Sequence, residues 1–307
     1  MEHRNQLMKG LLCGVIYIAL FMIFAFNIPL LNMFALVAMP LPVVYFTAIF
    51  GPRPGMVLTA AVGLLGTIAT LNPLAAFAFA VIGYVLGYAQ HKRRKGAELL
   101  LATIVASFVF LSAAYILLTA VTDLSVLQFV RESLQETQQL LSELGMESYD
   151  EAFIEEYVQL IESLMTFLLL LMAAVYAFLV YGAATMLFKR VDLPYHKLPK
   201  FREWAFPRFF LWFYFSLLLL SFLPFEPGSY MAAVTQTGIN LVSVLLIIQG
   251  VSLLFVYLQA RRLAKGVSVF IIIMVVISLL LVPFLLWAMK MIGVLDMVLR
   301  IRDRMKL

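Results

Sequence analysis

Long apolar runs separated by short polar segments make up most of the chain. A helix needs about 20 apolar residues to cross the hydrocarbon core of a bilayer, with about 17 to 25 as the usual range. On this scale the pattern predicts an all-α, polytopic transmembrane bundle of nine helices: residues 9–26, 29–50, 55–71, 73–90, 98–122, 162–188, 207–225, 231–259 and 267–289. The third and fourth runs are short, contain Gly63 and Gly66 and meet at Leu71-Asn72-Pro73. A helical hairpin that stops short of a full span, leaving about eight spans, is therefore the alternative there.

The segment at about 123–161 has a different pattern. Ten of the 17 Asp and Glu residues lie between Asp123 and Glu162, together with one base, Arg131. Apolar residues recur there at helical spacings, and Gly145 is the predicted helix stop: Leu124, Leu127, Val130, Leu134, Leu141 and Leu144, then Phe153, Tyr157, Leu160, Ile161 and Leu164. We expect two amphipathic helices that cap the outer face of the bundle, the second of which leads into the sixth membrane run. The simpler interpretation is a solvated connector, and the alternative is a lid or a docking surface for a partner.

Composition supports the bilayer as the solvent. The chain is 64% hydrophobic and 13% charged, whereas soluble domains are about 45–50% apolar and about 25% charged. Its one cysteine, Cys13, lies in the first apolar run, so no intrachain disulfide can form. We expect three parts: a five-helix region at 1–122, the acidic insert at 123–161, and C-terminal membrane helices at 162–307 with a basic loop at 189–208.

Basic residues predict the orientation, because positively charged short loops stay cytoplasmic. If nine helices alternate, one side receives Arg4, Lys9, Arg53, Lys92-Arg93-Arg94-Lys95, the stretch from Lys189 to Arg208, and Arg261-Arg262-Lys265. The expected location is a bacterial cytoplasmic (inner) membrane with the N-terminus inside, and the net charge of +5 marks topology rather than a nucleic-acid partner.

The basic tail from Lys290 to Lys306 does not fit this alternation. Three explanations stay open. A marginal helix does not cross, or residues 292–306 form an amphipathic helix on the outer surface, or the chain after Pro283 turns back inward.

Candidate catalytic chemistry is sparse. The first eight runs contain no Asp, Glu, Lys, Arg or His between the helix ends, and the ninth has only Lys290 at its edge. This disfavours proton-coupled exchange through the bundle. Metal-ligand pairs, nucleophile elbows and nucleotide-binding loops are missing from the sequence. We therefore expect no enzyme activity, no catalytic residues, no metal and no cofactor, and any ATP would have to be bound by another subunit.

The eighth run is the most polar. Gln236, Asn240 and Ser243 share one helical face in its outer half, whereas Gln249 and Ser252 lie on roughly the opposite face further in. The simpler interpretation is interhelical hydrogen bonding, each bond worth about 0.6 to 2 kcal/mol. The functional interpretation is a neutral wall that binds an uncharged small solute through Gln236, Asn240 and Ser243. Aromatic residues 209–215 of the seventh run could stack on such a ligand, although an interfacial aromatic belt is favoured.

Small residues at i and i+4 let helices approach closely. Gly10 and Gly14 in the first run, and Gly83 and Gly87 in the fourth, have this spacing. Since Gly10 and Gly14 lie near the predicted cytoplasmic face, they are candidates for docking a partner protein.

Several stretches of the chain resemble the YybS-type bacterial multi-pass membrane proteins. They are Pro40-Leu41-Pro42-Val43-Val44, Gly83 and Gly87, Leu198-Pro199-x-Phe201-x-x-Trp204-x-Phe206-Pro207, Ile248-Gln249-Gly250-Val251-Ser252 with Arg261-Arg262, and Gly293-Val294-Leu295-Asp296 with Arg302. This family is distantly similar, mainly in the first five helices, to the six-helix S components of energy-coupling-factor vitamin transporters and to membrane proteins of the cell-shape machinery. The resemblance implies a ligand-binding membrane subunit that uses ATPase and coupling subunits supplied by other proteins.

Two functions follow as hypotheses. The first is a transport-related, substrate-binding membrane subunit for a small, largely neutral solute, energised by partner proteins. The alternative is a non-transporting scaffold that organises cell-envelope or signalling proteins through the acidic insert and the basic loop.

Overall fold

The chain forms only helices, turns and loops in the residues that can be described. The computed structural model describes residues 2–122, 126–145, 150–225, 229–261, 266–267, 270–271, 274–275, 278 and 283–305. Within these ranges seven helices are long and apolar enough to cross a membrane: Arg4–Ala25, Leu31–Phe50, Pro52–Thr70, Pro73–His91, Gly96–Ala120, Glu151–Arg190 and Tyr230–Ala260. The helical membrane class is confirmed, and the count of nine spans is not.

Contacts between Cα atoms divide the chain into two compact units. Unit 1 comprises Met1–Thr137 and Leu168–Leu198, and unit 2 comprises Gln138–Phe167 and Pro199–Leu307. These bounds differ from the three parts expected from the sequence, because two of the boundaries fall inside helices, one in α7 (Val126–Glu143) and one in α8 (Glu151–Arg190). The three-part organisation stays a prediction.

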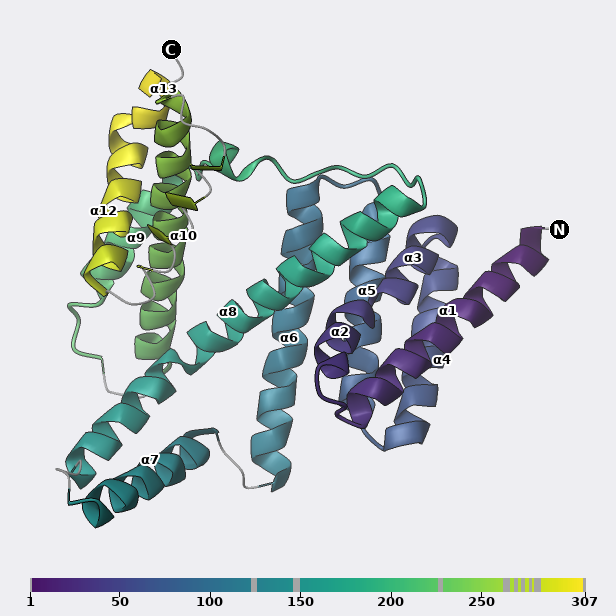
Figure 1. Ribbon diagram of the computed structural model, residues 1–307, viewed down its shortest axis with the longest axis horizontal. Coiled ribbons are helices and arrows are strands. Elements are labelled where there is room, and N and C mark those ends of the chain that lie inside the picture. The colour runs from purple at the N-terminus through teal and green to yellow at the C-terminus, as the bar shows by residue number, and fades with distance from the viewer. Residues whose placement is uncertain are drawn as a thin grey trace. The chain divides into compact units, whose positions relative to one another are not determined.

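Unit 1 contains most of the N-terminal helices (Figure 1). They are α1 (Glu2–Ala25), α2 (Leu31–Ala38), α3 (Leu41–Phe50), α4 (Pro52–Thr70), α5 (Pro73–His91) and α6 (Gly96–Thr122), joined by the second part of α8 (Glu151–Arg190). The second expected span is divided into α2 and α3 at Met39-Pro40, since a proline has no N–H for the helical ladder. The third and fourth runs form helices of 19 residues each, and Asn72 Oδ1 accepts from Ala75 N at 3.0 Å to begin α5.

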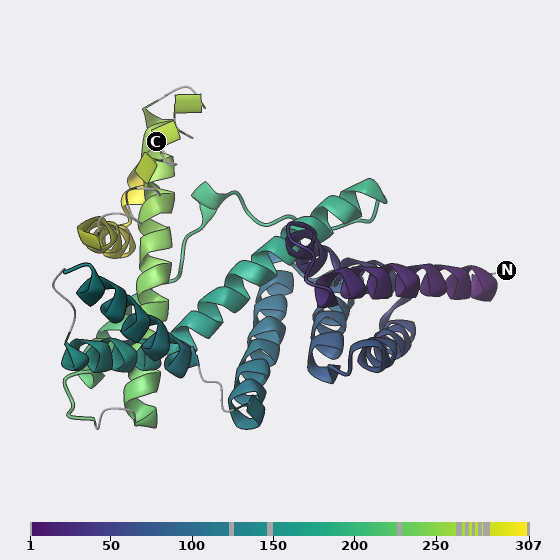
Figure 2. The ribbon, with the colours of Figure 1, turned by 60° about the horizontal axis from the view of Figure 1, so that its bottom comes forward.

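The core of unit 1 lies where α1 packs against α2, α3 and α4 (Figures 1 and 2). Tyr17 is fully buried there, and its hydroxyl donates to the carbonyl of Ala76 at 2.6 Å. Cys13 is also buried, so it is a helix-packed thiol. A methyl group added at Gly83 would lie 2.5 Å from the Pro40 carbonyl oxygen, and one at Gly87 would lie 2.7 Å from that of Val44. The Gly83 and Gly87 pair therefore lets α5 approach the backbone of α3.

The acidic insert contains two helices, as expected, and the second continues into the sixth expected span. The first helix is α7 (Val126–Glu143), and Gly145, with φ of +69°, ends it as predicted. The second expected helix is the first part of α8, which is one helix of 40 residues (Figure 1). The expected bounds of the sixth span, 162–188, were therefore wrong at the N-terminal end. No glycine or proline lies between Glu151 and Tyr181, so nothing in the sequence interrupts the helix there.

Unit 2 contains η1 (Phe201–Glu203), α9 (Phe209–Leu220), α10 (Tyr230–Ala260), α12 (Pro283–Leu299) and α13 (Ile301–Met305). Helix α9 has 12 residues, fewer than the expected span 207–225. The expected end of the ninth span at residue 289 was wrong, because α12 continues to Leu299. Most of residues 267–282 lie outside the described residues. Lys290 stays within α12, with its Nζ 5.7 Å from the centre of the Tyr214 ring.

Helices α10 and α12 cross with their backbones in close contact (Figure 1). A methyl group added at Gly250 would collide with the carbonyl oxygen of Met289, and one at Gly293 with that of Leu246. Both glycines are buried at the crossing. Glycine is required on each helix because any side chain would separate the two backbones.

Candidate functional site

The residues predicted to bind a solute lie in the first half of α10. Gln236 is exposed, and its Nε2 donates to Asn240 Oδ1 at 3.4 Å, one helical turn away. Asn240 and Ser243 are half-buried. The structure brings Gln236 and Asn240 together, whereas the hydroxyl of Ser243 makes no hydrogen bond within the described ranges.

Three polar atoms in this part of α10 are buried without a hydrogen-bond partner among the described residues. They are Thr235 Oγ1, Thr237 Oγ1 and Asn240 Nδ2. A buried polar group without a compensating hydrogen bond costs about 1–3 kcal/mol on scales derived from protein variants. This stretch of α10 therefore has hydrogen-bonding capacity that the described residues leave unused.

The aromatic run of α9 divides between the unit's interior and its surface. Tyr214 and Leu217 are buried in a cluster that includes Val242 and Leu246 of α10. Phe209 and Trp212 are largely exposed. Exposed rings fit the interfacial belt, which the sequence favoured over stacking on a ligand.

Gly10 and Gly14 face other helices of unit 1. A methyl group at Gly10 would lie 3.2 Å from the Phe46 ring, and one at Gly14 would lie 3.7 Å from Leu58 Cδ1. Both glycines thus pack against α3 and α4, while Leu11 and Leu12 are exposed on another face of α1. A partner-docking role for Gly10 and Gly14 stays a prediction.

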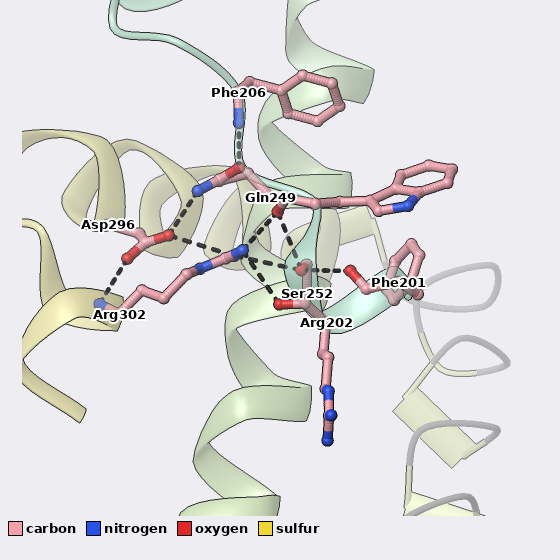
Figure 3. A network of polar contacts seen from close by, with 8 residues as sticks. Phe201, Arg202, Phe206, Gln249, Ser252, Asp296 and Arg302 are labelled. Atoms are coloured by element: carbon pink, nitrogen blue, oxygen red, sulfur yellow. Dashed lines mark hydrogen bonds and ion pairs between the residues drawn. The ribbon is translucent and has the colours of Figure 1, made fainter. Parts of the chain in front are cut away.

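A buried polar network in unit 2 joins α10, α12, α13 and the segment 201–206 (Figure 3). Asp296 is 4% exposed and Arg302 is 5% exposed, and the Arg302 Nη2 atom lies 3.5 Å from Asp296 Oδ2. The same Asp296 oxygen accepts from Gln249 Nε2 at 2.5 Å. The other oxygen, Oδ1, accepts from the Arg302 backbone N at 3.0 Å. Both carboxylate oxygens are therefore occupied.

The Arg302 guanidinium also holds the segment that precedes α9. Its Nη1 donates to the carbonyls of Trp204 at 2.6 Å and of Arg202 at 3.2 Å, and its Nη2 donates to Ser252 Oγ at 3.2 Å. In Figure 3 the Arg302 side chain extends toward Ser252 and Gln249. Ser252 Oγ in turn donates to the Phe201 carbonyl at 2.7 Å, and Phe206 N donates to Gln249 Oε1 at 3.1 Å. The Asp296–Arg302 ion pair thus connects the loop 201–206, helices α10 and α12, and the turn before α13.

The backbone between α12 and α13 positions the ion pair. Arg300 has a φ of +51°, in the left-handed region, and its N–H donates to the Asp296 carbonyl at 2.9 Å. This turn brings the backbone N of Arg302 to the Asp296 carboxylate. It also places Arg302 of α13 beside the carbonyls of Arg202 and Trp204. The three explanations for the basic tail stay open.

A pocket of about 210 Å³ lies beside the network. Its lining consists of Ala205, Phe206, Pro207, Arg208, Gln249, Asp296, Met297, Arg300 and Arg302. Unit 1 has a second pocket, of about 280 Å³, lined by Ala48, Ile49, Gln90, His91, Arg93, Leu193 and Pro194. No group of three or more His, Cys, Asp or Glu side chains in the described part of the chain is placed to hold a metal ion.

The sequence interpretation anticipated half of the network. Interhelical hydrogen bonding, proposed for the polar residues of the eighth run, is confirmed for Gln249. Asp296 and Arg302 were not singled out as site residues, because the ninth span was expected to end before them. One signal was available: three of the stretches that resemble the YybS-type proteins contain Phe201 and Trp204, Gln249 and Ser252, and Asp296 with Arg302. These stretches meet in the network.

Comparison with known proteins agrees with that resemblance. "Uncharacterized protein YybS" of Bacillus subtilis (strain 168) is 26% identical over 310 residues, which cover 97% of this chain and 99% of that protein. No solved structure matches the chain. The family model described as "Predicted membrane protein (DUF2232)" matches residues 15–297. With most of its length matched, the chain belongs to this family of predicted multi-helix membrane proteins.

Proposed function

We propose that this protein is a transport-related membrane subunit that binds a small, largely neutral solute, with ATPase and coupling subunits supplying the energy. The observation that carries the proposal is a set of buried polar atoms on α10, at Thr235, Thr237 and Asn240, that have no hydrogen-bond partner among the described residues. These groups are a hydroxyl or an amide, and none is charged. An uncharged ligand with donors and acceptors would complete their hydrogen bonds without bringing a charge into the bundle.

The number of membrane-length helices in unit 1 also supports a substrate-binding membrane subunit. Six of the seven membrane-length helices contribute to unit 1, since only Tyr230–Ala260 belongs wholly to unit 2. Six is the number of helices in the S components that the family resembles. We keep the proposed location in the bacterial cytoplasmic membrane, with the N-terminus inside, on the basis of the basic loops.

Removal of these polar groups tests the proposal. We expect the protein, extracted gently from its native membrane, to carry one stoichiometric small molecule in native mass spectrometry. The double variant Gln236→Leu, Asn240→Leu should lose it, and Thr237→Val should hold it more weakly, because a hydrogen bond to a neutral group contributes about 0.5–1.5 kcal/mol.

The matched control is Thr119→Val. The Thr119 hydroxyl already donates to the Ile116 carbonyl at 2.9 Å within α6, so its removal should leave the small molecule bound. If the wild-type protein carries no small molecule, or if all variants retain it equally, the solute site on α10 is wrong.

A scaffold is the second candidate, and α7 favours it. This helix has no buried residue, and its exposed side chains include Phe129, Leu140 and several carboxylates. An apolar stripe flanked by charge can bind a partner helix. Replacing residues 126–145 with a Gly/Ser linker of the same length should then remove an envelope or signalling protein from affinity-purified samples, with solute content unchanged. Loss of the solute alone would contradict the scaffold.

A further inference from the structure

The pocket beside the buried network carries an excess of positive charge. Three arginines line it, Arg208, Arg300 and Arg302, and the one carboxylate among the lining residues that the structure describes is Asp296. Both Asp296 oxygens are already bonded to Gln249 and Arg302 within the network. The carboxylate thus balances Arg302, and the charges of the other two arginines have no counterpart among the described lining residues.

Several donors at this pocket are unused. Arg302 Nε is buried without a hydrogen-bond partner among the described residues, although the rest of its guanidinium is fully engaged. Arg208 uses Nε and Nη2 to bond the carbonyls of Met297 and Val298, at 3.1 and 3.2 Å. Its Nη1 has no such bond. The Arg300 side chain is exposed and makes neither an ion pair nor a hydrogen bond with any side chain whose placement the structure describes.

The size and position of the pocket limit the class of ligand that it can bind. At about 210 Å³ the pocket is smaller than the range of about 300–1,000 Å³ typical of drug-sized ligands, so it suits a single small group. Arginine forks match the geometry of phosphate oxygens. The exposed rings of Phe209 and Trp212 follow Arg208 directly on α9, where acyl chains would lie next to a bound headgroup.

We propose that Arg208, Arg300 and Arg302 form a binding site for a phosphate-bearing anion, such as the headgroup of an anionic phospholipid. The buried Asp296 keeps Arg302 in place, and the two outer arginines supply the charge that attracts the anion. Basic pockets between helices on the predicted cytoplasmic side are suited to such headgroups. A soluble phosphate group has the same binding chemistry, and the experiment separates the two sources.

The test uses the full-length protein in neutral detergent, with phosphatidylglycerol as the probe and native mass spectrometry as the readout. The wild-type protein should retain one phosphatidylglycerol through repeated washing. Arg300→Gln should bind it about tenfold more weakly, since a charge-assisted hydrogen bond of about 1.5 kcal/mol corresponds to that factor. Arg300 is exposed and its side chain makes no bond to a described residue, so this variant should keep its fold.

The matched control is Arg304→Gln. Arg304 is exposed on α13 and does not line the pocket, but its removal changes the net charge equally. Loss of the lipid in Arg300→Gln but not in Arg304→Gln supports the site. Competition by millimolar inorganic phosphate would identify a soluble phosphate group as the ligand, and no competition would identify the lipid headgroup. Equal loss in both variants, or no retained phosphatidylglycerol and no phosphate binding in the wild type, would overturn the proposal.

Discussion

Replacing Asp296 with asparagine is expected to destabilise unit 2 by about 3–5 kcal/mol, because it leaves a buried arginine without its counter-charge. The amide has nearly the size of the carboxylate, so little packing is lost. Arg302 is 5% exposed, however, and cannot reach water without breaking its bonds to the carbonyls of Arg202 and Trp204. We therefore expect all the hydrogen bonds of the buried network to be lost together.

Tryptophan fluorescence during denaturant unfolding in detergent measures this effect selectively. All three tryptophans, Trp204, Trp212 and Trp287, lie in unit 2. The control is Glu203→Gln, the same chemical change at an exposed pair in the same loop, where the Glu203 and Arg202 side chains are 3.8 Å apart. We expect that control to cost at most about 1 kcal/mol. Equal stability of the two variants would mean that the buried pair does not hold unit 2 together.

The second large effect is expected at the crossing of α10 and α12. Gly293→Ala places a methyl group on the Leu246 carbonyl oxygen, and Gly250→Ala places one on that of Met289. The obstructing atoms belong to helix backbones and cannot rotate away, so the helices must separate. Each variant should lose about 3 kcal/mol, at the upper end of the usual cost of overpacking. Tryptophan fluorescence during denaturant unfolding measures this loss of stability as well.

Gly266→Ala is the control for the glycine variants. Among the residues that the structure describes, no atom lies within 4 Å of the methyl group that this substitution would add. Since alanine is more favourable than glycine in a helix by about 0.8–1.0 kcal/mol, that variant should be at least as stable as the wild type. If Gly293→Ala and Gly266→Ala unfold at the same denaturant concentration, the backbones of α10 and α12 are less closely packed at their crossing than described.

Apolar patterning was sufficient to predict the class of fold and most helix positions. Length and hydrophobicity alone predict α4, α5 and α6 to within a few residues, because each is bounded by prolines, glycines or basic residues. Gly145 was a correct stop for α7, since its φ of +69° is one that glycine adopts without strain. The sequence thus predicts a helix end well where a proline, a glycine or a basic residue at that position stops the helix.

Apolar patterning did not predict the end of a helix correctly where a residue distant in the sequence pairs with a charge inside that helix. Lys290 stood at the edge of the ninth expected span and Asp296 lay beyond it, yet both lie inside α12, one over the Tyr214 ring and the other bonded to Gln249. Helical periodicity shows which residues share a face. It does not show which face of another helix they meet, so a network formed by residues 201, 249, 252, 296 and 302 could not be assembled from the sequence.

The shared helix α8 has a consequence for how the protein is made. Unit 1 needs residues 168–198, which the ribosome synthesises after the 30 residues 138–167 that belong to unit 2. In the finished core, Leu86 and Leu99 pack with Val180, Ala184 and Phe188 of α8. The first helices must therefore wait in the bilayer with this surface uncovered, and a nascent chain halted before residue 190 is a natural substrate for a membrane insertion factor or a quality-control protease.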